Sequence, residues 1–166
     1  AGLAVRMNPI QENIIDDWER MIDTNIKGLL YVSRLVSPLM IERKKGHIIN
    51  IGSIAGKETY ANGNVYCASK SAVDVLSKAM RIDLLKHNIK VTAIHPGAVE
   101  TEFSIVRFKG DTQMASNVYK GFQPLSGKDV ADTIYYTTTL PAHVNINELL
   151  ILPTAQANTT HTLKNI

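Results

Sequence analysis

The chain has 166 residues, of which 45% are hydrophobic, with a formal net charge of +3 and one cysteine. This length and apolar content predict a single globular domain over residues 1–166, and the mild charge argues against a nucleic-acid partner. No stretch approaches the roughly 20 consecutive apolar residues of a membrane-spanning helix. The lone Cys67 excludes an intramolecular disulfide and favours a reducing compartment, so we expect a cytoplasmic protein.

A long helix is predicted over residues 18–40. Apolar residues recur there at intervals of three and four, and the acidic pair Asp16 and Asp17 stands where a helix usually begins. Asn25 lies on the apolar face, although asparagine competes for backbone hydrogen bonds and is a poor residue for a helix interior. Asn25 is therefore either a core amide with satisfied hydrogen bonds or a residue with a functional role.

Two buried strands are predicted over residues 47–53 and 89–94, with a helix over residues 66–84 between them. Strand, helix and strand in this order are typical of a parallel βαβ unit. The sequence therefore predicts an α/β fold.

Ligands bind such sheets beyond the carboxyl ends of the strands, where Ser53, Pro96 and Gly97 fall. The loop that follows the first strand would form a wall of the same site. Its candidates for contact with a substrate are Tyr60, Asn62 and Asn64.

Tyr66 and Lys70 stand four positions apart at the start of the second helix, so their side chains share one face. A fixed ammonium beside a phenol stabilises the phenolate and lowers the phenol pKa from its usual value of about 10. With the Ser53 hydroxyl nearby, the pair predicts a general acid and base. The alternative is a packed tyrosine beside a solvated lysine, since this spacing is common on ordinary helices.

Five stretches, in one order across most of the chain, resemble the short-chain dehydrogenases/reductases. They are Ala1–Gly2, Asp23–Asn25, Ile49–Ser53, Tyr66–Lys70 and Pro96–Thr101. Within that family, three more stretches are similar to NADP-dependent 3-hydroxy acid (serine or allo-threonine) dehydrogenases: Thr101–Ser104, Val106–Asp111 and Leu140–Asn147.

The resemblance implies a Rossmann-type doubly wound parallel sheet. The Gly-rich turn with which these enzymes begin does not occur here, so we expect the C-terminal two-thirds of a subunit, without its first nucleotide-binding part. The implied reaction transfers a hydride between NADP, with NAD not excluded, and the hydroxyl-bearing carbon of a small 3-hydroxy acid.

The resemblance also implies roles for individual residues. Tyr66 would exchange the hydroxyl proton of the substrate, and Ser53 would hydrogen-bond the reacting oxygen. Lys70 would lower the pKa of Tyr66 and hold the nicotinamide ribose, and Asn25 would mark a helix distortion and hold a water that links Lys70 to solvent. The other implied cofactor contacts are Ala1, Gly2, Pro96, Gly97, Val99 and Thr101.

A polar, irregular segment over residues 98–127 is expected to cover the site as a lid. Arg107 is the first candidate for a substrate carboxylate, because a planar guanidinium can pair with one through two bonds. Lys109 is the second candidate. The equal alternative for Arg107 is an ordinary surface arginine.

The end of the chain predicts a helix from Lys128, with Tyr135 on its inner side, and a last strand over residues 149–152. The five histidines show no metal-ligand spacing, so no metal is expected.

Two other functions stay open. An extended short-chain epimerase or dehydratase also uses Tyr-x-x-x-Lys, but such enzymes lack the Pro-Gly-x-x-x-Thr segment. A truncated chain would instead act without catalysis, through subunit association alone. The helices over residues 18–40 and 66–84 resemble those that form a four-helix subunit interface in this family, and they predict a homodimer or homotetramer.

Overall fold

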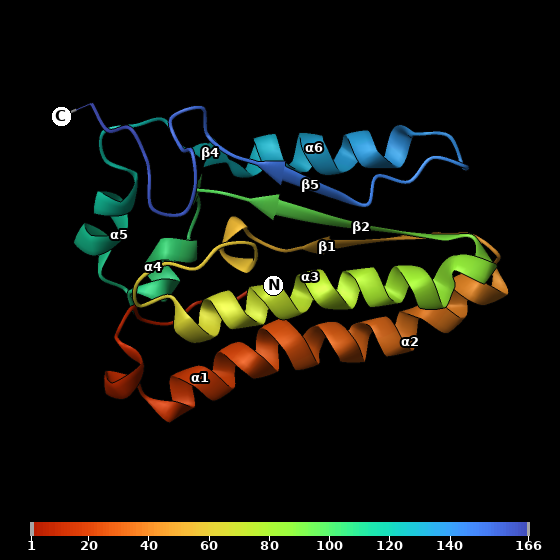
Figure 1. The fold of residues 1–166 in the computed structure, drawn as a ribbon, viewed down its shortest axis with the longest axis horizontal. Coiled ribbons are helices and arrows are strands. Elements are labelled where there is room, and N and C mark those ends of the chain that lie inside the picture. Colours follow the sequence, from red (N-terminus) through yellow and green to blue (C-terminus); the bar gives the residue numbers. More distant parts are fainter. Residues whose placement is uncertain (1, 166) are drawn as a thin grey trace.

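Three parallel strands form the sheet at the centre of this computed structural model, which describes residues 2–165. Their order is β1 (Gly46–Ile51), β2 (Ile89–Pro96) and β5 (Glu148–Ile151), as Figure 1 shows. Gly46 pairs with Ile89, and Ala93 pairs with Glu148. Because β2 lies between the other two, its β-branched and small residues are almost wholly buried. The predicted parallel α/β sheet is confirmed.

Helices cover both faces of this sheet (Figure 1). On one face, α1 (Ile15–Ile22), a π-helical turn (Asp23–Lys27) and α2 (Gly28–Glu42) follow one another beside α3 (Asn64–Leu84). On the other face lies α6 (Gly127–Thr139). Short 3-10 turns occur at Ile10–Glu12, Ile54–Gly56 and Leu85–His87. Within residues 2–165, no helix combines the length and the apolar character needed to cross a bilayer.

The predicted helices exist, but their ends differ from expectation. The helix predicted from Trp18 begins at Ile15 and contains the π turn, in which the backbone accommodates one extra residue. The helix predicted from Tyr66 begins at Asn64, whose side chain accepts a hydrogen bond from the backbone N–H of Val65. The π turn agrees with the distortion expected at Asn25.

The lid over residues 98–127 is not irregular, and this prediction was wrong. It contains two short helices, α4 (Phe103–Arg107) and α5 (Thr112–Tyr119), and a parallel strand pair, β3 (Val99–Glu100) with β4 (Leu125–Ser126). Asp111 caps α5 by accepting a bond from the N–H of Met114 at 2.9 Å. Elements this short carry too few residues for a periodic pattern, which is why the sequence did not reveal them.

The last helix starts where Ser126 and Asp129 form a capping box, one residue before the predicted start at Lys128. Tyr135 is 70% exposed, so its predicted inward position is wrong, and the small Thr137 is buried instead. A tyrosine two positions from a buried residue points to the other side of a helix.

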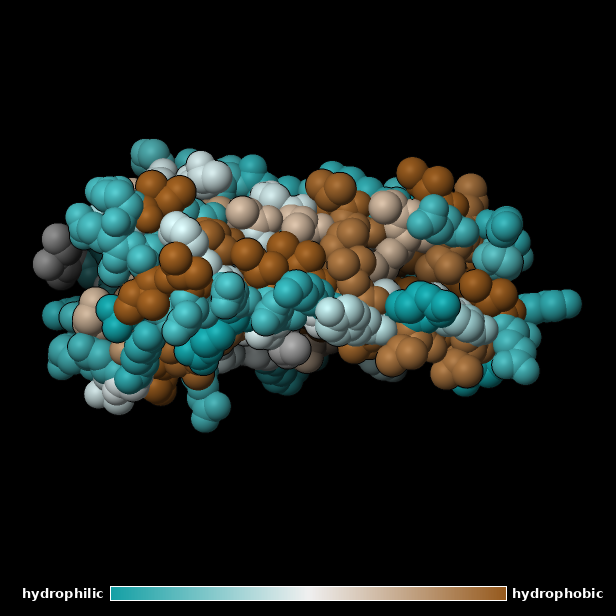
Figure 2. Space-filling view, turned by 90° about the horizontal axis from the view of Figure 1, so that it is seen from below, coloured by the Kyte–Doolittle hydropathy of each residue, from teal (hydrophilic) through white to brown (hydrophobic). Residues whose placement is uncertain are grey.

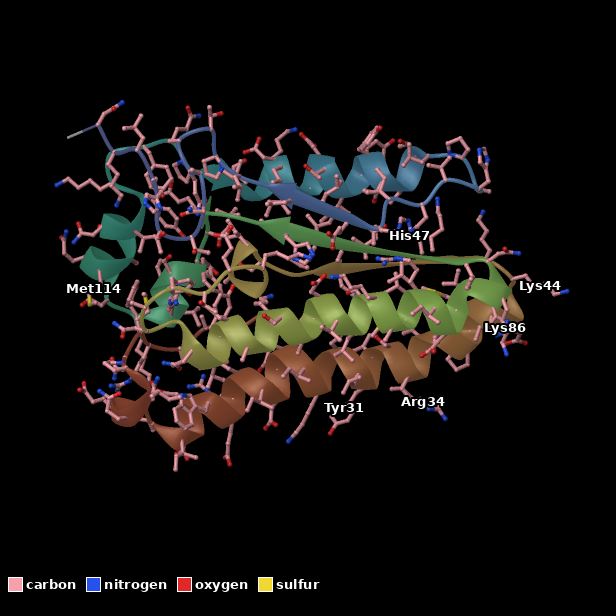
Figure 3. The ribbon with its side chains drawn as sticks, viewed as in Figure 1. Tyr31, Arg34, Lys44, His47, Lys86 and Met114 are labelled. Atoms are coloured by element: carbon pink, nitrogen blue, oxygen red, sulfur yellow. The ribbon has the colours of Figure 1, made fainter. Side chains whose placement is uncertain are left out.

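Several large apolar side chains on α2 lie exposed. Val32, Leu35 and Leu39 are 62%, 71% and 53% exposed. Figure 2, seen from the side on which α1 and α2 lie, shows brown apolar areas among the polar ones. Tyr31 and Arg34 also project from α2 away from the sheet (Figure 3). This surface, Tyr31 to Leu39, is called the α2 face below.

Candidate active site

A cavity of about 810 Å³ opens beyond the carboxyl ends of β1 and β2, and it is lined by residues of the strand ends and of the lid. It brings together ten of the residues that the sequence singled out: Gly2, Ser53, Tyr60, Tyr66, Lys70, Pro96, Gly97, Val99, Thr101 and Arg107. Ala1 lies outside the described residues. The cavity stands where the strand order predicted a ligand site.

Tyr66 projects from the first turns of α3 into this cavity. Its ring lies 5.7 Å from the ring of Phe103, and the guanidinium carbon of Arg107 lies 5.4 Å from its centre. Burial raises the pKa of Tyr66 to about 12, while the Ser53 hydroxyl and the positive charge of Arg107 oppose that rise.

Lys70 lies one turn further along α3 and is 5% exposed. Its ammonium donates a hydrogen bond to the Ile51 carbonyl at 2.9 Å, and burial lowers the pKa of Lys70 to about 8. We predicted that Lys70 lowers the pKa of Tyr66. In the structure the cation that acts on Tyr66 is Arg107, because the Lys70 ammonium is turned toward the end of β1.

Ser53 follows β1 directly and has an extended backbone, which delivers its hydroxyl to the sheet edge. Its oxygen accepts a hydrogen bond from the N–H of Ala55 at 3.1 Å, and this contact begins the 3-10 turn that follows. An oxygen that accepts from the backbone leaves the hydroxyl hydrogen to be donated. The Ser53 hydroxyl hydrogen is therefore left for a partner on the cavity side, where Tyr66 lies.

Asn25 lies in the π turn, is 5% exposed and does not line the cavity. Its amide donates to the Leu3 carbonyl at 2.8 Å and to the Ser69 hydroxyl at 2.9 Å, and its oxygen accepts from the Leu3 N–H at 2.7 Å. The contacts join the π turn to the loop after Gly2 and to α3. Through these bonds to Leu3, Asn25 holds the loop at Gly2, which lies beside the Lys70 ammonium.

The cofactor segment expected after β2 is held from two sides. The Gln156 side chain accepts a hydrogen bond from the Ala98 N–H at 2.8 Å, and a Cβ on Gly97 would lie 2.3 Å from the same Gln156 oxygen. From the lid, the Tyr119 hydroxyl donates to the Val99 carbonyl at 2.8 Å. A larger residue at position 97 would displace the Gln156 side chain from this position.

Arg107, at the end of α4, reaches over the cavity. It donates a hydrogen bond to the Tyr60 hydroxyl at 2.6 Å, and its guanidinium lies 5.6 Å from the centre of the Tyr60 ring. The Arg107 Nε atom is buried and has no partner among the described residues. The Arg107 guanidinium therefore lines the cavity beside Tyr66, where a cation could receive an anion.

Three candidate substrate residues lie outside the cavity. Asn62 occupies a turn with a left-handed backbone, φ 65°, and Asn64 donates to the Asn8 carbonyl at 2.9 Å as part of the helix start. Lys109 is paired with Asp17. Their polar types suggested a binding role, but the loop and lid turn these side chains elsewhere.

Other residues line the cavity without having been singled out: Phe103, Val118 and Tyr119 belong to the predicted lid, and Met7, Gln156 and Thr159 lie outside every predicted site segment. One signal was present for Gln156, because it follows the last predicted strand and so falls at the carboxyl edge of the sheet. The others reach the site through long-range packing that no local pattern encodes.

Among the described residues, one group could offer metal ligands: Asp74, His95 and Glu148. The Lys57 ammonium lies 2.9 Å from Asp74 and 2.8 Å from Glu148, so a cation of the protein already stands between the two carboxylates. Burial lowers the pKa of His95. The cluster is a partly exposed ion network that joins the segment after Ser53 to β5.

Comparison with known proteins identifies the family. The short chain dehydrogenase family matches residues 1–111. The chain is 51% identical over 158 residues to the NADP-dependent 3-hydroxy acid dehydrogenase YdfG of Shigella flexneri, covering 95% of this chain and 64% of the relative. It is 46% identical over 158 residues to sulfoacetaldehyde reductase 2 of Chromohalobacter salexigens, covering 95% and 63%.

Among solved structures, the closed form of a serine dehydrogenase complexed with NADP+ matches with a TM-score of 0.94 and 48% identity, covering 100% of this chain and 67% of that one. The chain spans about 64% of the length of the 3-hydroxy acid dehydrogenases that it matches. A family match over residues 1–111, with relatives near 50% identity, shows that the chain belongs to the short chain dehydrogenase family.

Proposed function

We propose that this chain is the catalytic part of an NADP-dependent oxidoreductase that transfers a hydride to or from the hydroxyl-bearing carbon of a small 3-hydroxy acid. The observation that carries the proposal is the convergence of Ser53, Tyr66, Lys70 and Arg107 on one cavity. The family match and the dehydrogenases and reductases among the relatives favour this function over the epimerase alternative.

In this proposal Tyr66 accepts the substrate hydroxyl proton during oxidation and returns it during reduction. Ser53 donates a hydrogen bond to the reacting oxygen, which carries negative charge as the proton leaves. The bound nicotinamide supplies or accepts the hydride. Arg107 favours the phenolate form of Tyr66, because its charge lowers the pKa of that phenol.

The residues around Lys70 fit the nicotinamide end of a dinucleotide. A Cβ on Gly2 would lie 3.3 Å from the Lys70 ammonium, so the missing side chain keeps the space beside it open. The ammonium has three hydrogens, and one of them is donated to Ile51. We propose that Lys70 binds ribose hydroxyls, that Pro96, Gly97, Val99 and Thr101 line the nicotinamide, and that Asn25 positions the Gly2 segment.

A spectrophotometric assay of the enzyme with its complete natural chain tests this function. We expect NADP+ to be reduced with serine or another short 3-hydroxy acid, more efficiently than NAD+, and a short uncharged alcohol to react poorly. A protein that reduces neither cofactor with any hydroxy acid would contradict the proposal and leave subunit association as the alternative.

We propose that Arg107 binds the substrate anion. Both relatives above are named for substrates that carry an acid group, a carboxylate in one and a sulfonate in the other. Arg107 is half-buried, lines the cavity and has its guanidinium carbon 5.4 Å from the centre of the Tyr66 ring, so it can hold an acid group close to the proposed proton donor.

Replacing Arg107 with methionine should raise KM for a 3-hydroxy acid by about 10- to 100-fold, because a charge-assisted pair is lost. The KM for an uncharged alcohol should change little. The matched control is Arg43→Met, which removes an exposed arginine at the end of α2. Equal KM changes for charged and uncharged substrates in the Arg107 variant would show that Arg107 does not bind the anion.

We also propose that the enzyme acts in the cytoplasm, where its free, buried Cys67 stays reduced.

We propose that subunits associate through helices 18–40 and 66–84. The exposed apolar side chains of the α2 face support association. The change Leu35→Glu should lower the mass measured by light scattering from that of a dimer or tetramer to that of one subunit. Ile10→Glu, at an exposed apolar residue outside that face, should leave the mass unchanged; a loss of mass in both variants would contradict the proposal.

A further inference from the structure

Asp17, on α1, is a buried carboxylate that joins three parts of the chain. Its side chain is only 4% exposed. The Lys109 ammonium of the lid lies 3.0 Å from each of its two oxygens, and Arg6 Nε lies 3.3 Å away in the loop before α1. Arg20 is more distant, at 3.8 Å. Asp17 therefore connects the lid with a segment about 100 positions earlier in the chain.

The two close cations of Asp17 both have a left-handed backbone. Arg6 has φ 60° and Lys109 has φ 53°. This conformation costs free energy in residues other than glycine, and it persists where surrounding contacts require it. Lys109 follows the end of α4, where its N–H donates to the Val106 carbonyl at 3.1 Å, and both residues place their side chains on Asp17.

The same two segments meet through one backbone hydrogen bond. The N–H of Arg6 donates to the carbonyl of Arg107 at 2.9 Å. Arg107 stands two positions before Lys109. The lid is therefore held at two neighbouring places, by the backbone bond at Arg107 and by the ion pair at Lys109. Lys109 itself does not line the cavity, whereas Arg107 and Met7, the neighbour of Arg6, do.

We infer that Asp17 is a positioning residue for substrate binding: by holding Lys109 and Arg6 together, it keeps the lid closed and the Arg107 guanidinium in the cavity beside Tyr66. The inference rests on the proposed anion-binding role of Arg107. It also replaces the predicted direct role of Lys109, whose ammonium is committed to Asp17 rather than to the cavity.

A simpler role for Asp17, as an acidic residue in the first turn of α1, does not account for these contacts. Such a residue needs no partner from the lid, yet Lys109 reaches it from 92 positions away. A carboxylate that leaves water needs close partners to compensate its loss of hydration, and the partly exposed Lys109 contacts both oxygens of Asp17.

The test compares Lys109→Met, Lys109→Arg and the matched control Arg20→Met in the enzyme with its complete natural chain. Arg20 faces the same carboxylate but lies on α1, so it does not connect to the lid. Hydrogen exchange reports the Arg6 N–H directly. In Lys109→Met we expect faster exchange of the peptide that contains Arg6, while Arg20→Met should exchange like the wild type.

Binding supplies the second measurement. Lys109→Met should weaken the binding of propionate, an unreactive carboxylate, by about tenfold in the presence of NADP+. The reason is that a smaller fraction of the enzyme has the lid closed. The KM for a 3-hydroxy acid should rise in parallel, with kcat nearly unchanged, and Lys109→Arg should restore both values. The KM for an uncharged alcohol should change far less.

These readouts separate the inference from the proposed function. A wild-type enzyme that binds propionate but oxidises no hydroxy acid would refute the proposed reaction and leave the role of Asp17 standing, provided that Lys109→Met weakens propionate. The inference would be overturned if Lys109→Met left the hydrogen-exchange rate of the peptide with Arg6 unchanged. It would also be overturned if this variant bound propionate as tightly as the wild type. Equal effects of Arg20→Met and Lys109→Met would also overturn it.

Discussion

Replacing Tyr66 with phenylalanine should lower kcat by about 10²- to 10⁴-fold, the usual contribution of a placed general acid or base. Cofactor affinity should stay nearly unchanged, because the phenylalanine ring keeps the packing against Phe103 and the place under Arg107. The measurement is steady-state turnover of a 3-hydroxy acid together with a cofactor titration. Near-normal turnover in this variant would refute the proposed mechanism.

Tyr60→Phe is the matched control for that experiment. Tyr60 lines the same cavity and also loses one hydroxyl, but its contact is with Arg107. We expect Tyr60→Phe to change KM rather than kcat.

The pH profile adds a second comparison between the wild type and Tyr66→Phe. Since burial raises the pKa of Tyr66 to about 12, oxidation by the wild type should accelerate as the pH rises through the alkaline range. The phenylalanine variant should lose this dependence.

Replacing Lys70 with methionine should stabilise the fold at pH 7 by about 1 to 3 kcal/mol while turnover is lost. Burial lowers the pKa of Lys70 from 10.5 to about 8, so the folded chain carries this ammonium at a free-energy cost that methionine removes. The lost hydrogen bond to the Ile51 carbonyl offsets part of the gain. Denaturant unfolding measures the change, with Lys86→Met as an exposed control that we expect to be nearly neutral.

The gain should depend on pH in a definite direction. Between pH 8 and 10.5 the unfolded state binds more protons at Lys70 than the folded state, so wild-type stability rises with pH in this window. The methionine variant lacks this rise. The difference in the free energy of unfolding between the variant and the wild type should therefore narrow as the pH increases. A variant less stable than the wild type at pH 7 would show that the ammonium contacts outweigh the loss of hydration.

The residues predicted best are those whose position follows from short-range geometry. Ser53 ends a strand, and Tyr66 and Lys70 are one turn apart on a helix, so local pattern alone brings them to one edge of the sheet. Spacing does not describe solvation, however. Spacing predicted that Lys70 and Tyr66 face the same space, and both line the cavity. It gave the wrong direction for the shift in the pKa of Tyr66, which depends on burial and on Arg107.

The lid shows where local pattern stops being informative. The contact of Lys109 with Asp17 and the contact of Gln156 with Ala98 join residues far apart in the chain. Neither contact leaves a periodic signal, because each depends on how packed elements meet. For the same reason, Asn64 appeared in the sequence as a possible ligand contact, although its neighbours engage it as part of a helix start.

The π turn at Asp23–Lys27 sets the rotational phase between α1 and α2. One residue corresponds to about 100° of rotation in a regular helix, so removing a residue from this turn would rotate every side chain of α2 against α1 by about that angle. Asn25 would leave its bonds to Leu3, and Leu35 would turn away from its present outward direction. A single extra residue thus determines both which amide faces the loop after Gly2 and which apolar side chains face outward.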